Sequence, residues 1–180
     1  MYHNEWKRRA KIEHLVKGGN HPNQNQQHHN MPLRREISAG GVVYKVVNGE
    51  LLIGFILDPY KKWIFAKGHV EKGEAIVDAA IRETREEMGI QAIKVKQPLG
   101  SIVFWFQRNK TRIRKTVHYF LMETEPHEVG TPQKEEYITA IRWVKANEAG
   151  QVLGYKNTRT ILDRALKALQ LWYARYDDVV

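Results

Sequence analysis

The segment GHVEKGEAIVDAAIRETREEMGI, residues 68–90, restricts the fold more than any other part of the sequence, because it joins a glycine-containing loop to an amphipathic helix. Apolar or small side chains recur at helical spacing, at Ile76, Ala79, Ala80, Thr84 and Met88. Gly89 stands where a left-handed residue commonly ends a helix. The segment predicts a helix over residues 75–88 with one buried side and one charged side.

Three glutamates crowd the last part of this helix, at Glu83, Glu86 and Glu87. Residues three and four apart are neighbours on a helix, with Cβ atoms about 5–6 Å apart. At an effective dielectric constant of about 20, two such charges repel by roughly 3 kcal/mol, so in a cleft they need a counter-ion. Oxygen ligands without cysteine suit Mg²⁺ or Mn²⁺. The alternative is a solvated helix face, with Arg82 and Arg85 close by.

Most of the remaining chain is β-rich. Runs of β-branched and aromatic residues lie at residues 37–47, 51–57, 63–66, 93–107, 114–124 and 138–145. Asn48 and Gly49 predict a hairpin between the first two runs, and the run at 63–66 leads into the loop at Gly68. A short helix is expected within residues 147–155 and an amphipathic one over residues 158–176. This order of elements indicates an α+β or layered α/β/α domain.

Length and composition narrow the class of protein. The 180 residues give room for one ordinary domain with an appendage, and the absence of cysteine excludes disulfides and cysteine-based zinc sites. No apolar run is long enough to span a membrane and no signal-peptide block is present, so a cytoplasmic protein is expected. The net charge of +9 favours polyanionic partners, although a merely basic protein fits it equally well.

The beginning of the chain differs in composition from the rest. Residues 18–32, GGNHPNQNQQHHNMP, hold almost no large apolar side chain, so burial cannot offset the entropy lost on ordering them. We expect residues 1–31 to form a basic, flexible arm and linker, with weak nucleic-acid binding as one role to test. Residues 32–180 are expected to form the folded domain.

The spacing within residues 68–90 resembles the Nudix box, G-x5-E-x7-R-E-U-x-E-E-x-G-U. The matching residues are Gly68, Glu74, Arg82, Glu83, Glu86, Glu87, Gly89 and Ile90. Thr84 replaces an aliphatic residue, and its methyl group can still pack. ISAGGVVY before the box and IRWVKANEA after it are also similar to the Nudix family, so the resemblance covers residues 33–176. It implies a Nudix-like α/β/α sandwich with a mixed sheet, a catalytic loop-helix-loop and a C-terminal helix.

Nudix enzymes hydrolyse a nucleoside diphosphate linked to another moiety, by attack of water on phosphorus. The resemblance implies that Glu83, Glu86 and Glu87 hold Mg²⁺ or Mn²⁺ together with the main-chain carbonyl of Lys67, with Glu87 as the strongest candidate. It also implies that Glu74 and Arg82 form an ion pair that orients the helix and its catalytic carboxylates. An ordinary surface salt bridge is the alternative for that pair.

The remaining roles are less closely tied to the box. The general base is a box glutamate or one of Glu135 and Glu136 in a later loop, both of which can equally be solvated. Lys67 and the arginines of the basic connection at residues 108–114, among them Arg112 and Arg114, would contact the polyphosphate unless they face water. The candidates for base stacking, at least half of which should be core residues, are Trp63, Phe104, Trp105, Phe106 and Tyr119.

The substrate class rests on two further segments. FAKGHVEKGE, with Lys67 and His69 around the first glycine, and TVHYFLM, residues 116–122, are similar to segments of Nudix hydrolases of diadenosine and other dinucleoside polyphosphates. Ala66 replaces the proline that is usual there. The similarity implies a diadenosine polyphosphate substrate with Lys67 and His69 as contacts. The alternatives are an RNA 5′-pyrophosphohydrolase, an enzyme that removes oxidised nucleotides, and a nucleotide-sensing module without hydrolysis.

Overall fold

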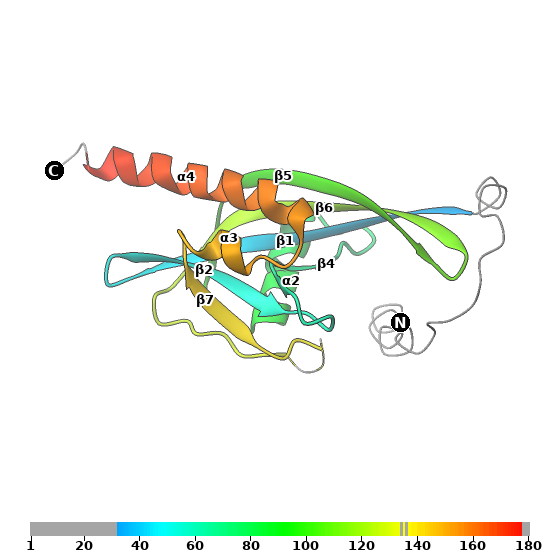
Figure 1. The fold of residues 1–180 in the computed structure, drawn as a ribbon, viewed down its shortest axis with the longest axis horizontal. Coiled ribbons are helices and arrows are strands. Elements are labelled where there is room, and N and C mark those ends of the chain that lie inside the picture. Colours follow the sequence, from blue (N-terminus) through cyan, green and yellow to red (C-terminus); the bar gives the residue numbers. More distant parts are fainter. Residues whose placement is uncertain (1–31, 134, 136, 178–180) are drawn as a thin grey trace.

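The structure is a computed structural model that describes residues 32–133, 135 and 137–177, with the main chain alone for residues 172–177. The arm predicted over residues 1–31 lies outside the described residues. The strands are β1 (Leu33–Val47), β2 (Glu50–Leu57), β3 (Trp63–Ile64), β4 (Ala66–His69), β5 (Ile93–Arg108), β6 (Thr111–Thr124) and β7 (Ile141–Lys145). The helices are α2 (Ile76–Met88), α3 (Ala149–Val152) and α4 (Arg159–Asp177), with a 3₁₀ turn, η5 (Lys156–Thr158) (Figure 1).

Strand β1 is the centre of a seven-stranded sheet in the order β3-β2-β1-β6-β5, with β4 paired to β1 and β7 paired to β2. The first half of β1 runs antiparallel to β4, which places Ser38 opposite His69. On its other edge β1 runs parallel to β6, which places Glu36 beside Lys115. Because parallel and antiparallel pairs occur in one sheet, the mixed sheet that we expected is confirmed.

Alternate residues of β1 enter two apolar clusters on opposite faces of the sheet, as the period of a strand requires. Val42 and Tyr44 belong to the cluster that α4 covers, and Ala39 and Val43 belong to the cluster that α2 covers. The helix residues in these clusters are Ala149 of α3, Ile161, Leu162, Ala165, Ala168 and Leu169 of α4, and Ala79, Ala80 and Met88 of α2. Figure 1 shows the two helices on opposite sides of β1, so the predicted α/β/α layering is confirmed.

The local signals for α2 hold in the structure. The helix ends at Gly89, whose φ of 60° is left-handed and whose N–H donates to the carbonyl of Arg85 at 2.8 Å. Thr84, at the position where the box has an aliphatic residue, is fully buried. Its hydroxyl donates to the carbonyl of Ala80 at 2.6 Å, so the helix itself satisfies the polar atom and the methyl group can pack.

Three predicted boundaries were wrong. Residues 108–114 are mostly strand rather than a connection, because Asn109 and Lys110, with φ values of 50° and 56°, suffice for the turn between β5 and β6. Gly68 lies in β4 rather than in a loop, because residues 66–69 pair with β1. The last strand begins at Ile141 rather than at residue 138.

No helix in the described part of the chain is long and apolar enough to cross a lipid bilayer.

Candidate functional site

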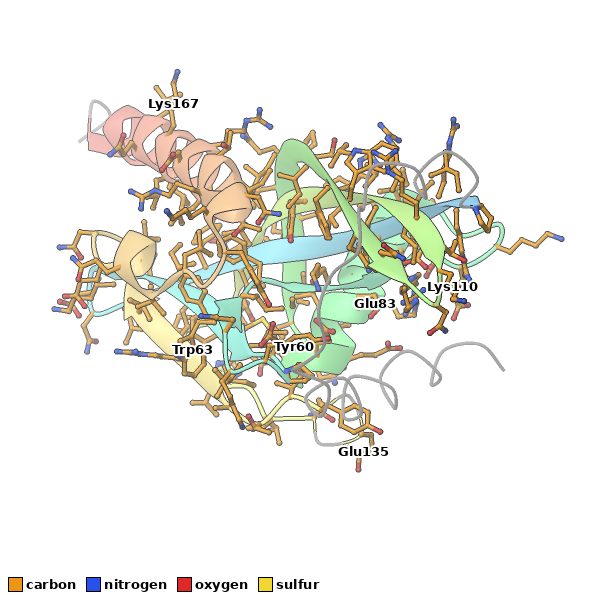
Figure 2. The ribbon with its side chains drawn as sticks, turned by 45° about the vertical axis from the view of Figure 1, so that its right-hand side comes forward. Tyr60, Trp63, Glu83, Lys110, Glu135 and Lys167 are labelled. Carbon is orange, nitrogen blue, oxygen red and sulfur yellow. The ribbon has the colours of Figure 1, made fainter. Side chains whose placement is uncertain are left out.

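Helix α2 directs two of its three glutamates into the protein and leaves the third at the surface. Glu83 is fully buried and Glu87 is 5% exposed, whereas the side chain of Glu86 is 42% exposed. Glu83 and Glu87 are four residues apart, so they lie on the same side of the helix. The solvated-face interpretation therefore fits Glu86 but not the other two glutamates. Figure 2 shows Glu83 between α2 and the strands.

Gly68 makes room for Glu83. A Cβ atom at Gly68 would overlap both oxygens of the Glu83 carboxylate, so only glycine lets β4 approach the helix this closely. Oε1 of Glu83 accepts a hydrogen bond from Nη1 of Arg82 at 2.9 Å. Its buried Oε2 has no hydrogen-bond partner among the residues that the structure describes. A charged oxygen buried in this way is costly unless it is paired, which suits it to a bound cation.

Arg82 connects α2 to the chain that precedes it. Its Nε and Nη2 donate to the two oxygens of Glu74 at 2.8 and 2.9 Å, which is a bidentate pair. Nη2 also donates to the carbonyl of His69 at 3.0 Å, and Nη1 donates to Glu83 at 2.9 Å and to Glu86 at 3.2 Å. The hydrogen bonds to Glu74 raise the pKa of Arg82, and Arg82 lowers the pKa of Glu74. The contact expected between Glu74 and Arg82 is present.

Glu87 is tied to the same strand as Glu83. The main-chain N–H of Lys67 donates to Oε2 of Glu87 at 2.7 Å. Within the described ranges, no three Asp, Glu, His or Cys side chains come together as a metal site. A cation between Glu83 and Glu87 would therefore need further oxygens from the main chain or from a substrate. The donors at this place suit a hard divalent cation, because Glu83 and Glu87 supply carboxylate oxygens and no thiol is present. Oε2 of Glu83, which has no hydrogen-bond partner among the described residues, is available to such a cation.

A second charged cluster lies around Glu36 of β1, whose side chain is 2% exposed. Its Oε1 accepts a hydrogen bond from Nη2 of Arg108 at 2.6 Å, and its Oε2 lies 3.4 Å from Nε2 of His69. The hydrogen bond with His69 and the charges of Arg108 and Lys115 lower the pKa of Glu36 to about 2, against the opposing effect of burial. Glu36 is therefore ionised at neutral pH and can only accept hydrogen bonds.

Lys115 extends this cluster toward the glutamates of α2. It stands beside Glu36 in the register of β1 and β6 and is 8% exposed. Burial, reinforced by the charge of Lys67, lowers the pKa of Lys115 to about 8, while Glu36 and Glu87 oppose this shift. Lys115 is therefore within electrostatic range of both charged clusters. We call Lys67, Arg108 and Lys115 the cationic group.

Two aromatic rings adjoin the cationic group. Phe104 of β5 is paired with Lys115, and Phe106 lies next along the same face, with 6.0 Å between the two ring centroids. The guanidinium of Arg108 lies 5.8 Å from the centre of the Phe106 ring. Both rings are partly exposed. Tyr119, in contrast, is 1% exposed and belongs to the core, as expected for part of the aromatic set.

Several predicted site residues lie elsewhere. Side chains alternate along β6, so Arg112 and Arg114 are on the face opposite Lys115, where the guanidinium of Arg112 lies 4.5 Å from the ring of Trp105. Glu135 is exposed, and Figure 2 shows it on the outside of the molecule. Glu136 lies outside the described residues. The structure thus brings together the box residues with Lys67 and His69, but not these three described residues.

Sequence reasoning missed Glu36 and Lys115, and treated Arg108 only as one arginine of a basic connection. One signal was available for Lys115. Ile113 and Val117, two residues before and after it, are apolar and fully buried, so a lysine interrupts an otherwise buried row of a strand. Glu36 had no comparable signal, because its partners come from strands that are distant in the sequence.

The chain was compared with known proteins by sequence. The family model of the NUDIX domain matches residues 35–165. MutT4 of Mycobacterium tuberculosis (strain CDC 1551 / Oshkosh), which is named as a mutator protein, is 34% identical over 137 residues, covering 72% of this chain and 54% of that protein. The chain thus spans about half the length of this relative. The asymmetrical bis(5′-nucleosyl)-tetraphosphatase of Mus musculus is 33% identical over 117 residues, covering 63% of this chain and 76% of that protein.

Solved structures agree on the fold. An Ap4A hydrolase of C. elegans, in a binary complex, superposes with a TM-score of 0.63 at 22% identity, covering 75% of this chain and 98% of that one. The dihydroneopterin triphosphate pyrophosphohydrolase of E. coli superposes with a TM-score of 0.56 at 22% identity, covering 76% of this chain and 99% of that one. Since the family model covers most of the chain and the acids of the box meet at one strand, the chain belongs to the NUDIX domain family.

Proposed function

We propose that this protein is a pyrophosphohydrolase that cleaves a phosphoanhydride bond of a dinucleoside polyphosphate, with a diadenosine polyphosphate as the first substrate to test. Membership of the family and the 33–34% identity to asymmetrical bis(5′-nucleosyl)-tetraphosphatases of two mammals support this activity. The observation that carries the proposal is the buried Glu83 carboxylate, whose Oε2 is unpartnered among the described residues and lies against Gly68.

The residues that would hold a divalent cation, Mg²⁺ or Mn²⁺, are Glu83, Glu86, Glu87 and the main chain of Lys67. Such a cation, when bound, lowers the pKa of coordinated water and neutralises charge on phosphate oxygens. The chain's own contribution is to fix the carboxylates. Arg82 restrains Glu83 and is itself held by Glu74, and the N–H of Lys67 restrains Glu87. Fixed carboxylates need no rearrangement during the reaction.

The substrate side of the site is suited to a nucleotide. The cationic group supplies donors and positive charge for the oxygens of several phosphates. Phe104 and Phe106 supply partly exposed ring faces, on which a base can stack. Cations next to aromatic rings favour a nucleoside polyphosphate over inorganic pyrophosphate, which has no base.

The general base belongs to the glutamates of α2 or to Glu135 and Glu136. Glu135 is exposed to solvent. The variants Glu135→Gln and Glu136→Gln together separate the two possibilities. A fall in kcat with an unchanged KM would identify the later loop, whereas unchanged kinetics of the variants at both 135 and 136 would identify a glutamate of the helix.

The direct test is product analysis with diadenosine tetraphosphate and added Mg²⁺ or Mn²⁺. We expect hydrolysis to ATP and AMP that depends on the metal and falls by about 10³-fold in Glu87→Gln. Glu123→Gln is the matched control, because Glu123 forms a part-buried pair with Lys96 on the same sheet. Unchanged turnover and unchanged metal dependence in Glu87→Gln would overturn the proposal.

The mycobacterial relative favours one further candidate function. Because MutT4 is named as a mutator protein, hydrolysis of an oxidised nucleoside triphosphate is the second activity to test. The same assay with that nucleotide and with triphosphorylated RNA ranks the substrates by kcat/KM. Binding of a nucleotide without turnover of any of the three substrates would identify a nucleotide-sensing module instead.

A further inference from the structure

The further inference concerns Glu36, which is a buried carboxylate outside the Nudix box. Its side chain is 2% exposed, and a carboxylate in such a place is stable only if it is well paired. These two partners come from two other strands, since Glu36 is on β1, His69 is on β4 and Arg108 is at the end of β5. Glu36 therefore connects elements that meet only in the complete fold.

The two carboxylate oxygens of Glu36 contact different side chains. Oε1 accepts a hydrogen bond from Nη2 of Arg108 at 2.6 Å, and Nε of the more exposed Arg34 lies 3.5 Å from the same oxygen. Oε2 lies 3.4 Å from Nε2 of His69. An ionised carboxylate only accepts, so the hydrogen of this last contact is on Nε2. The ring of His69 and the guanidinium of Arg108 are thus held by one group.

The restraint on His69 acts from both ends of the residue. Its carbonyl accepts a hydrogen bond from Nη2 of Arg82 at 3.0 Å, and its ring is held by Glu36. Arg108 uses one of its five N–H donors for Glu36 and is 25% exposed in its side chain. It therefore keeps donors for an anion while its orientation is fixed.

We propose that Glu36 is a positioning residue that orients the side chains of His69 and Arg108 toward the polyphosphate of the substrate, an inference that rests on the proposed function. A purely electrostatic effect has the opposite sign. Removing a negative charge next to a polyanion site should strengthen binding of the polyanion, whereas loss of orientation should weaken it. The neutral, isosteric variant Glu36→Gln separates these two effects.

The test measures binding of inorganic tripolyphosphate to the metal-free full chain by calorimetry, so it does not depend on turnover. We expect the Kd to rise about 10-fold in Glu36→Gln, the size of one lost charge-assisted hydrogen bond, and to stay unchanged in Glu123→Gln. In the Arg108→Gln background, Glu36→Gln should have a clearly smaller effect, because the two residues act through one contact. Thermal melting verifies that each variant is folded. If Glu36→Gln does not fold, Glu36→Asp replaces it. A higher Kd is again expected, because the shorter side chain cannot reach both His69 and Arg108.

Turnover gives a second and independent reading. With diadenosine tetraphosphate, Glu36→Gln should raise KM about 10-fold and change kcat less than about twofold, since positioning of the non-reacting phosphates mainly affects binding. Equal or tighter tripolyphosphate binding in the folded variant, or no binding by the unmodified protein, would overturn the role of Glu36. Absence of hydrolysis in the unmodified protein would instead overturn the proposed function and leave the binding test to decide on Glu36.

Discussion

The Glu83 carboxylate lies against Gly68 so closely that any Cβ atom at position 68 would overlap both of its oxygens. Gly68 has no left-handed φ, so backbone freedom does not explain the glycine. Gly73, in the same loop-helix segment, is the reverse case, with a φ of 83° and open space around its α-carbon. The two glycines therefore serve different needs, and a substitution at each should have a different effect.

Gly68→Ala should reduce turnover by about 100-fold, because displacement of a metal-binding carboxylate by about 1 Å has effects of that size. Gly73→Ala is the control. It should lower the free energy of unfolding by about 1–2 kcal/mol through backbone strain, with a much smaller effect on kcat. Steady-state kinetics and chemical denaturation of both variants decide the matter. A Gly68→Ala protein with normal kcat would show that Glu83 is not held by this contact.

Added Mg²⁺ or Mn²⁺ should stabilise the protein through Glu83. At a metal concentration of 100 times the Kd, the gain in unfolding free energy is about 2.7 kcal/mol, which thermal melting can detect. Glu83→Gln should remove this gain. Without metal, the same variant should be as stable as the unmodified protein or more stable, because it removes a buried charge that has an unpaired oxygen, while the amide oxygen can still accept the hydrogen bond from Arg82. An equal metal-induced gain in Glu83→Gln would place the cation elsewhere.

Arg82→Lys should lower kcat by about 10–100-fold, the range found for residues that orient metal ligands. Lysine keeps the charge but cannot reproduce the bidentate pair with Glu74 together with the hydrogen bonds to Glu83 and to the carbonyl of His69. The matched control is Arg85→Lys on the exposed side of the same helix, where one hydrogen bond to the carbonyl of Gln91 is at stake. Equal kinetics of the two variants would contradict the orienting role.

Binding of a polyphosphate should weaken as the pH rises through about 8. The pKa of Lys115 is lowered to about 8, so its positive charge is present below that pH and lost above it. Loss of one charged contact weakens binding by about 10-fold. Lys115→Arg should remove the transition, because arginine stays charged. Calorimetric titration with tripolyphosphate at pH values below and above 8 tests the prediction, with Lys96→Arg as the control. If the weakening with pH persists in Lys115→Arg, another group must be responsible for it.

Glu36 should make the stability of the protein sensitive to acid. Its pKa is lowered from 4.5 to about 2 in the folded state, so its contribution is complete above pH 4.5 and is lost as the pH falls toward 2. Glu36→Gln should lower the free energy of unfolding by about 1–3 kcal/mol at neutral pH and by less in acid. Denaturation curves at several pH values measure the difference, and a difference independent of pH would contradict this account.

The helix and its acids could be predicted from the sequence because their signals are local. The spacing of Ala79, Ala80 and Met88, and the glycine at position 89, depend only on the geometry of one helix. The hairpin at Asn48 and Gly49 is local in the same way, and both of these residues have positive φ values. Helical spacing also places Glu83 and Glu87 on one side, although it does not tell which side is buried.

The places of Arg108 and Lys115 in the cationic group could not be predicted because they depend on register. Whether Arg112 and Arg114 or Ile113 and Lys115 face the site is fixed by the pairing of β6 with β1 and β5, and a slip of one residue would exchange the two sets. Irregularities in β5 between Val95 and Gly100 add to the ambiguity, because they shift the alternation of its side chains. Local sequence carries little information on such pairings.

The parallel pairing of β1 with β6 also determines when the site can form during synthesis of the chain. Residues 33–44 pair with residues 112–123, so the first strand must wait for a partner that leaves the ribosome much later. The acidic helix emerges before Lys115 and Arg108 do. A nascent chain that ends between the helix and β6 therefore carries the acids of the site without Arg108 and Lys115, which join them only as β5 and β6 dock.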